Sequence, residues 1–180
     1  MTSAPRSKSS TRRPCNCKGN MRNYSFRRLT SEDLPLMQRW LQTSHVKVWW
    51  PNANKQIALM QQDMNNPEIT MLVVSLIDHP FAYIHDHDAR SFGLPQFGDL
   101  PPGSRVISTF VGDNDFMGQG HSAGYIEARL RDLRLRHPLI AAGPNTTDTR
   151  AIGIYAQAGF HKRRLVSTRD GKLVQVMTHH

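Results

Sequence analysis

The chain has 180 residues, a length typical of one domain, and 38% of them are hydrophobic. Its formal net charge is +9, and six of these charges lie in residues 1–22, which contain no acidic side chain. No apolar run approaches the ~20 residues of a membrane span, and the basic N-terminus lacks the apolar stretch of a signal peptide. We therefore expect a soluble, cytoplasmic protein that does not bind membranes.

Residues 1–22 are rich in Ser, Thr, Pro and Arg and contain almost no apolar side chains. Such a segment cannot bury enough surface to offset the entropy of ordering, so we predict a disordered basic tail before one domain over residues 23–180. The tail is either a solvated arm or an arm that binds RNA, and we expect no other contact with nucleic acid. Cys15 and Cys17 lie in this tail and fit neither a disulfide framework nor a four-ligand zinc site, and we predict no metal.

Hydrophobic periodicity predicts the secondary structure of the N-terminal half of the domain. Residues 24–29 are predicted as an edge-like strand, and Thr30 as the N-cap of a helix that ends near Leu41. A second helix is expected over residues 55–64. Residues 70–77 form a nearly continuous apolar run, which is typical of a strand covered on both faces, and residues 81–87 are its hairpin partner.

The C-terminal half alternates strands and helices. We predict a loop over 93–103, a strand over 104–112, a helix over 118–136, a short strand over 138–142, a helix over 148–158 and a hairpin formed by 160–167 and 173–177. The order of these elements predicts a mixed α/β sheet with helices on both faces.

A turn with small residues links the strand at 104–112 to the long helix that follows. Gly118, Gly120 and Ser122 would let backbone amides approach an anion at the N-terminus of the helix, which is a phosphate-binding arrangement. A Rossmann dinucleotide domain does not fit, because its glycine turn follows the first strand of a βαβ unit.

A second motif follows about two dozen residues later, with Pro144, Asp148, Ala151, Tyr155, Gly159 and Phe160 in a loop–helix–turn context. Together the two motifs resemble the GNAT N-acetyltransferases, whose pyrophosphate turn has the pattern (Gln or Arg)-x-x-Gly-x-(Gly or Ala). Within that superfamily the chain is most similar to aminoglycoside 6'-N-acetyltransferases and to siderophore hydroxylysine acetyltransferases. The resemblance implies the GNAT fold, a mostly antiparallel sheet with one splayed parallel strand pair.

The resemblance also implies acetyl-CoA as acyl donor and transfer by direct attack of a primary amine in a ternary complex. The positions that match the donor site of the family are Phe110, Val111, Met117, Gly118, Gln119, Gly120, His121, Ser122, Asp148, Ala151 and Tyr155. Four positions of the two motifs depart from the family pattern, which predicts reduced affinity for the donor: Met117, Ser122, Gly143 and Asp148.

Three residues are candidates for catalysis. Tyr155 occupies the position that protonates the departing thiolate in the family, although its ring could instead belong to the core. Ser108 aligns with an Asp or His of the relatives, and because a serine hydroxyl does not titrate near neutrality it could orient a water but not act alone as base. Substitute bases lie on the neighbouring strand in His85, Asp86, His87 and Asp88, of which we name Asp86. Alternation places Asp86 on the face opposite His85 and His87.

The acceptor site is predicted to contain Trp49, Trp50, His85, Asp86 and His87, while the two tryptophans could instead pack under a loop. An aminoglycoside is the leading small-molecule acceptor, and a hydroxylysine or other siderophore precursor is the second. A catalytically weak CoA-binding module recruited through the basic tail is the alternative outside enzymes. We expect a monomer or a homodimer.

Overall fold

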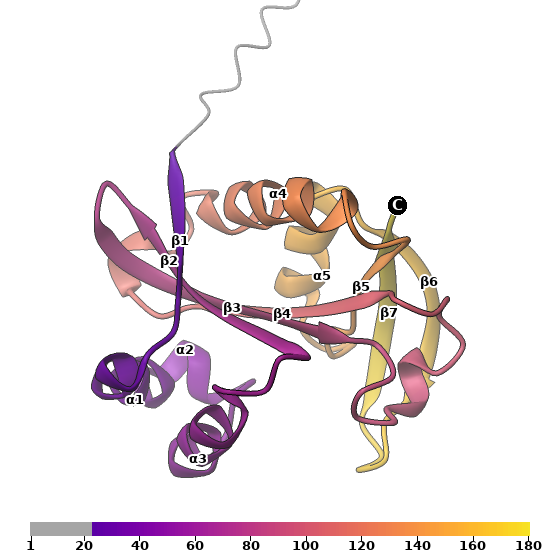
Figure 1. Ribbon diagram of the computed structural model, residues 1–180, viewed down its shortest axis with the longest axis horizontal. Coiled ribbons are helices and arrows are strands. Elements are labelled where there is room, and N and C mark those ends of the chain that lie inside the picture. Colours follow the sequence, from indigo (N-terminus) through magenta and orange to yellow (C-terminus); the bar gives the residue numbers. More distant parts are fainter. Residues whose placement is uncertain (1–22) are drawn as a thin grey trace, which may run out of the picture.

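The computed structural model describes residues 23–180, so the predictions for the tail and for Cys15 and Cys17 lie outside the described residues. Within residues 23–180 no helix is long and apolar enough to cross a membrane. Figure 1 shows one curved sheet with helices packed above and below it.

The sheet has seven strands in the order β1-β2-β3-β4-β5-β7-β6. All neighbouring strands are antiparallel except β4 and β5. This arrangement confirms the predicted mixed sheet. The strands are β1 Tyr24–Arg28, β2 Ile69–Leu76, β3 His79–Asp88, β4 Arg105–Val111, β5 Ile140–Ala142, β6 His161–Ser167 and β7 Leu173–His179.

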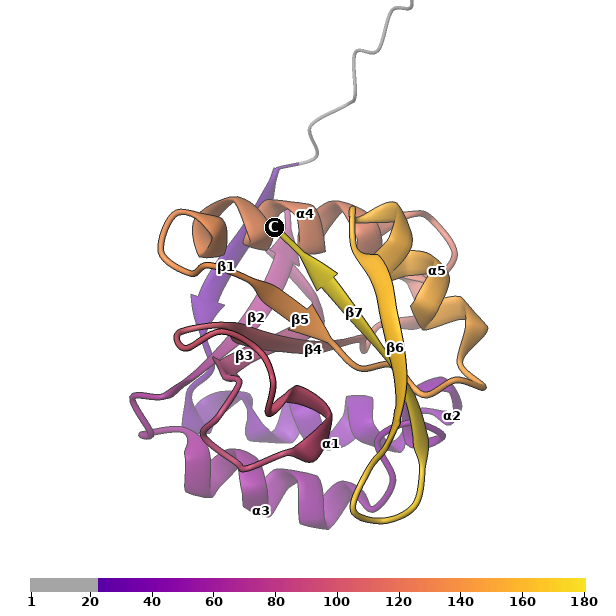
Figure 2. The same ribbon diagram turned by 90° about the vertical axis from the view of Figure 1, so that its right-hand side faces the viewer.

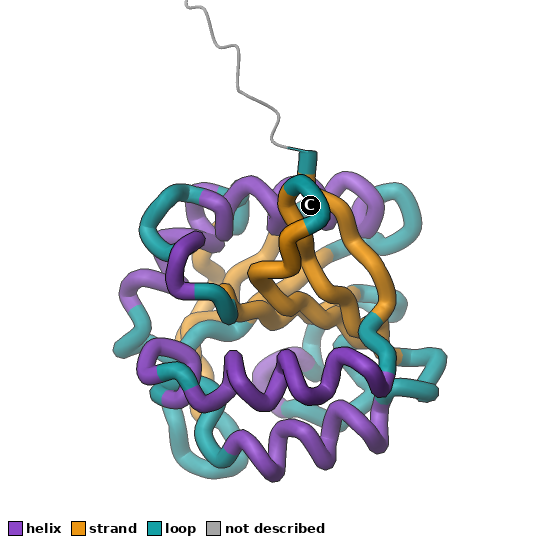
Figure 3. The backbone as a smooth tube through the Cα atoms, turned by 90° about the vertical axis from the view of Figure 1, so that its left-hand side faces the viewer, coloured by secondary structure: helices purple, strands orange, loops and turns teal. Residues whose placement is uncertain are grey.

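The helices form two layers, one on each face of the sheet (Figures 2 and 3). One layer holds α1 Leu34–Gln42, α2 Ser44–Lys47 and α3 Ala53–Asp63, and the other holds α4 His121–Arg134 and α5 Thr149–Gln157. The sequence did not predict α2, because four residues are too few to show a helical period. A short 3-10 turn, Pro95–Phe97, interrupts the predicted loop.

Each helical layer has its own apolar core against the sheet. Leu72 and Val74 of β2 belong to the core under α4 and α5, whereas Met71 and Val73 belong to the core over α1 and α3. Alternate side chains of one strand therefore enter different cores. This two-sided burial explains the continuous apolar run of β2 and confirms that prediction.

The parallel pair in the middle of the sheet diverges after a short contact. Only Arg105 with Ile140 and Val106 with Ala141 are paired in the β4–β5 ladder. Beyond these residues the two strands separate, so the sheet opens between them. The opening lies between the end of β4 and the N-terminal ends of α4 and α5.

Candidate functional site

A cleft of about 430 Å³ occupies the opening between β4 and β5. Its walls come from the end of β4, the first turns of α4 and α5, the segment after α1 and the β6–β7 hairpin. Ten of the site residues predicted from the sequence line it: Trp49, Trp50, Ser108, Phe110, Val111, Met117, Ser122, Asp148, Ala151 and Tyr155. The fold thus brings together residues that lie more than 100 positions apart in the chain.

The glycine turn lies at the N-terminus of α4. Gly118 and Gly120 have φ values of 74° and 75°, a left-handed conformation that glycine adopts without steric cost. The same conformation explains why α4 begins at His121 and not at the predicted Gly118. A Cβ atom at either glycine would meet nothing within 4 Å, so the turn borders open space. The amides of a first helical turn lack intrahelical partners, and the turn can therefore hold a phosphate.

Two predicted side chains of this turn point elsewhere. The His121 ring is buried, and its Nδ1 atom lies 3.1 Å from the Tyr24 hydroxyl. The Gln119 side-chain amide donates to the backbone carbonyl of Asp115. These two residues can therefore serve an anion through their backbone amides and not through their side chains.

A β-bulge ends β4 beside the cleft. The N–H groups of Gly112 and Asp113 both donate to the Phe81 carbonyl, at 2.8 and 3.1 Å. The Val111 carbonyl accepts a hydrogen bond from His45 Nε2 at 2.8 Å. Because a carbonyl can only accept, this contact assigns the ring hydrogen of His45 to Nε2. These contacts fix the backbone at the point where β4 reaches the cleft.

Tyr155 on α5 reaches the cleft from the helical layer formed by α4 and α5. Its side chain is buried, and burial raises the pKa of its hydroxyl above the usual value, so the phenol stays protonated at neutral pH. Asp148 caps the same helix, because its Oδ1 atom accepts a hydrogen bond from the Ala151 amide at 2.9 Å. The hydrogen bond to the Ala151 amide therefore fixes the Asp148 carboxylate in the wall of the cleft.

Ser108 lies on β4 directly opposite His85 of β3 in the strand register. Ser108 lines the cleft, and His85 lines a second cavity of about 160 Å³ together with His87 and Trp50. Trp50 lines both cavities, so the two adjoin at its side chain. Its ring packs edge-on against Phe110 and His85, with centroids 5.2 and 5.8 Å apart, so Trp50 combines packing with a place in the cleft.

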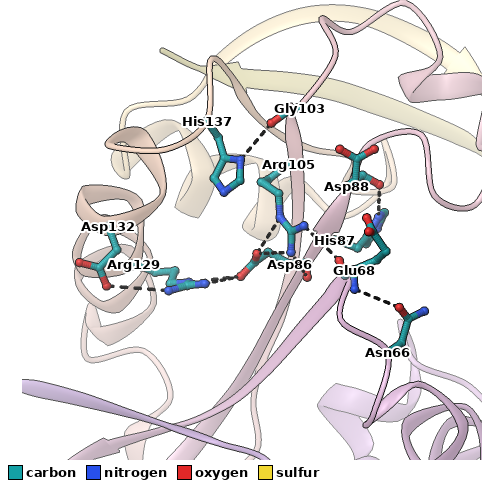
Figure 4. A network of polar contacts seen from close by, with 10 residues as sticks. All are labelled: Asn66, Glu68, Asp86, His87, Asp88, Gly103, Arg105, Arg129, Asp132 and His137. Atoms are coloured by element: carbon teal, nitrogen blue, oxygen red, sulfur yellow. Dashed lines mark hydrogen bonds and ion pairs between the residues drawn. The ribbon is translucent and has the colours of Figure 1, made fainter.

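Asp86 lines neither cavity and instead pairs with two arginines. Its carboxylate is 1% exposed and faces α4 (Figure 4). Oδ1 accepts from Arg105 Nε and Nη2 at 2.9 and 2.7 Å, and Oδ2 accepts from Arg129 Nη2 at 2.7 Å. The alternation predicted for residues 85–87 is confirmed, but it directs Asp86 away from the cleft. The roles we assigned to Asp86 in catalysis and acceptor binding are therefore corrected to the pairing of two buried arginines.

A family model described as an acetyltransferase (GNAT) domain matches residues 30–168. The chain belongs to this GNAT acetyltransferase family. The match covers both motifs that carried the resemblance, and that prediction is confirmed. Among the described residues no group of three or more His, Cys, Asp or Glu side chains could hold a metal ion.

Relatives of this GNAT acetyltransferase include the aminoglycoside N(6')-acetyltransferases type 1 of Klebsiella pneumoniae and Serratia marcescens. Each is 26% identical to this chain, over 86% of this chain and 82% of the relative. The solved structure of AAC(6')-Ib with coenzyme A and kanamycin has a TM-score of 0.76 at 24% identity, covering 87% of this chain and 94% of that one. The aminoglycoside N(6')-acetyltransferase of Legionella pneumophila has a TM-score of 0.73 at 18% identity, covering 86% and 90%. These structures have the same fold as this chain.

Sequence reasoning missed several residues that line the GNAT cleft. His45 precedes the tryptophan pair by four positions, and only its contact with the Val111 carbonyl shows its place. Tyr125 of α4 lies with its hydroxyl 2.7 Å from Thr109 Oγ1 inside the cleft wall. The helix that carries His45 was not predicted, and Tyr125 reads as an ordinary residue of the long helix. Nothing in either local pattern indicates the strand that the residue contacts.

Proposed function

We propose that the protein transfers the acetyl group of acetyl-CoA to a primary amine of a small molecule, by direct attack within a ternary complex. The observation that carries this proposal is the cleft itself. It opens between β4 and β5, borders a glycine turn suited to phosphate and contains the buried phenol of Tyr155.

The residues of the cleft suit the two ends of acetyl-CoA. The amides around Gly118 and Gly120 would bind the pyrophosphate, and the backbone of Phe110 and Val111 would hold the pantetheine arm and polarise the thioester carbonyl. The neighbouring structure with coenzyme A in a chain of the same fold supports this assignment.

The chemistry requires a neutral amine and a protonated leaving group. We propose that the Ser108 hydroxyl orients a water that takes the amine proton as the nitrogen attacks the thioester carbon. The new C–N bond forms as the C–S bond breaks, and Tyr155 donates its proton to the leaving thiolate. Tyr155 then recovers a proton from solvent. The raised pKa of Tyr155 keeps the phenol protonated before transfer, as a proton donor must be.

Aminoglycosides are the first acceptors to test, because the curated relatives are aminoglycoside N(6')-acetyltransferases. Hydroxylysine and related siderophore precursors are the second class. The assay measures release of free thiol from acetyl-CoA with each amine, beside calorimetric binding of CoA.

Two substitutions test the mechanism. Tyr155→Phe should lower kcat by about 10²-fold or more, the usual contribution of a positioned acid, while CoA binding stays unchanged. Ser108→Ala should lower kcat, whereas Ser104→Ala is a matched control because the buried Ser104 hydroxyl has no partner within residues 23–180. Equal kcat values for Tyr155→Phe and wild type would remove Tyr155 from the mechanism.

The alternative is a CoA-binding module without turnover, and Ser108 at the position of a base is the observation that favours it. Tight CoA binding with no turnover on any amine would establish this alternative. Deletion of residues 1–22 would then abolish salt-sensitive binding to nucleic acid, whereas an enzyme would keep its amine turnover after the deletion.

A further inference from the structure

The second cavity, which we call the histidine pocket, adjoins the site of transfer. Trp50 lines both the pocket and the cleft, and His85 is paired with Ser108 across the β3–β4 ladder. An amine placed at Ser108 would therefore have its carbon body next to this pocket. The following inference rests on the proposed function and concerns the acceptor of that same site.

The two histidines of the pocket are neutral hydrogen-bonding groups. His87 Nδ1 lies 2.9 Å from the Asp88 carbonyl, which can only accept, so the ring hydrogen is on Nδ1 and Nε2 is left as an acceptor. Burial lowers the pKa of His87, and burial together with the neighbouring His87 lowers the pKa of His85 to about 4. Near neutral pH the two imidazoles that line the pocket are therefore uncharged, and they bring no positive charge to it.

Negative charge is scarce around the two cavities. Three carboxylates line them within residues 23–180, and two are engaged, since Asp148 caps α5 and Asp170 pairs with Lys172 at 3.2 Å. Asp63 is the third, and it has no side-chain hydrogen bond or ion pair in this part of the chain. A polycation would need several free carboxylates to replace its hydration. This site offers one.

Apolar surface is instead concentrated at the two openings. Leu59 and Phe92 line the histidine pocket and are each 41% exposed, and Val48 and Trp49 line the cleft and are 65% and 42% exposed. These four are half of the eight large hydrophobic residues exposed within residues 23–180. Exposed apolar groups gathered around a cavity are typical of a ligand-binding site.

The volume of the pocket sets the size of what it holds. A cavity of about 160 Å³ has the scale at which an apolar protein cavity of ~150 Å³ accepts one benzene ring. The Phe92 ring packs edge-on against His87, with centroids 4.8 Å apart, which makes the walls aromatic. One aromatic ring matches this volume.

We propose that the acceptor is an aromatic monoamine, a primary amine on a short chain that ends in one ring with a hydrogen-bond donor. The ring lies in the histidine pocket between Phe92 and Trp50, and His87 Nε2 accepts the hydrogen bond of its hydroxyl or ring N–H. The amine extends past His85 to Ser108, where it meets the thioester. This acceptor class differs from the aminoglycosides that the names of the relatives suggest.

The test compares kcat/KM, by thiol release, for tyramine, phenethylamine, kanamycin and spermidine. Tyramine should exceed kanamycin and spermidine by at least about tenfold. Phenethylamine lacks the hydroxyl, so the lost hydrogen bond should make its kcat/KM about two- to tenfold lower than that of tyramine.

Phe92→Ala should raise the KM of tyramine about tenfold and leave CoA binding unchanged, because the bound ring loses one apolar contact surface. Leu135→Ala, which removes a leucine that is 84% exposed and lines neither cavity, is the matched control.

His87→Gln should reduce the preference for tyramine over phenethylamine, a ratio that does not depend on the folded fraction of the variant. Turnover of kanamycin above tyramine, or an unchanged KM in Phe92→Ala, would overturn the aromatic acceptor and leave the acetyltransferase intact. Bound CoA with no turnover on any amine would overturn both proposals.

Discussion

Asp86→Asn separates a structural role of this carboxylate from a catalytic one. The substitution keeps the size of the side chain and removes the negative charge that pairs with both Arg105 and Arg129. Their side chains are 10% and 12% exposed. Four hydrogen bonds from the two guanidinium groups end on the carboxylate, at 2.7 to 3.2 Å. Loss of one partner from such a buried cluster costs about 3–5 kcal/mol.

The assay is urea unfolding followed by circular dichroism. With an m-value of about 2 kcal/mol/M, a loss of that size lowers the unfolding midpoint by about 2 M. Asp132→Asn is the control, because the Asp132 side chain is 57% exposed and lies 3.8 Å from Arg129, and such a pair contributes at most about 1 kcal/mol.

Activity completes the test. When corrected for the folded fraction, kcat of Asp86→Asn should stay close to that of the wild type, because Asp86 lines neither cavity. A variant with an unchanged unfolding midpoint and a kcat lowered 10²-fold or more, the effect of removing a general base, would refute this reasoning and restore Asp86 as the base.

Two further predictions concern the turn and the histidine pocket. Gly118→Ala places a Cβ at φ 74°, at a cost of about 1 kcal/mol, and should raise the KM of acetyl-CoA several-fold; Gly153→Ala, inside α5 and with open space around it, should leave this KM unchanged. The pKa of His85 is lowered to about 4 by burial and by His87, so its contribution to stability is complete above pH 6.5 and is lost as the pH falls toward 4. Between pH 7 and 4.5 the wild type should therefore lose about 2–3 kcal/mol more unfolding free energy than His85→Gln, measured by urea titration at each pH. Equal losses would contradict a His85 that stays neutral in the folded protein.

The local sequence pattern predicted most helices and strands, because the hydrophobic periodicity and the turn residues that indicate them involve residues near one another in the chain. The glycine turn before α4 requires left-handed backbone, which glycine alone adopts freely, and the turn is visible in the sequence. The alternation of His85, Asp86 and His87 follows from the two-residue period of a strand. Element ends were less accurate, and α2 was missed, since short helices are defined by contacts and not by periodicity.

The sequence by itself therefore determined the fold class, the glycine turn before α4 and the two sides of β3. Only the tertiary structure decided what each side meets. Asp86 pairs with Arg105 and Arg129, which lie 19 and 43 residues further along the chain, and no local pattern encodes such contacts. The histidine pocket likewise depends on how α3 and the loop that carries Phe92 pack over the sheet. Side-chain direction is a property of the strand, whereas burial, charge pairing and cavity shape are properties of the packed whole.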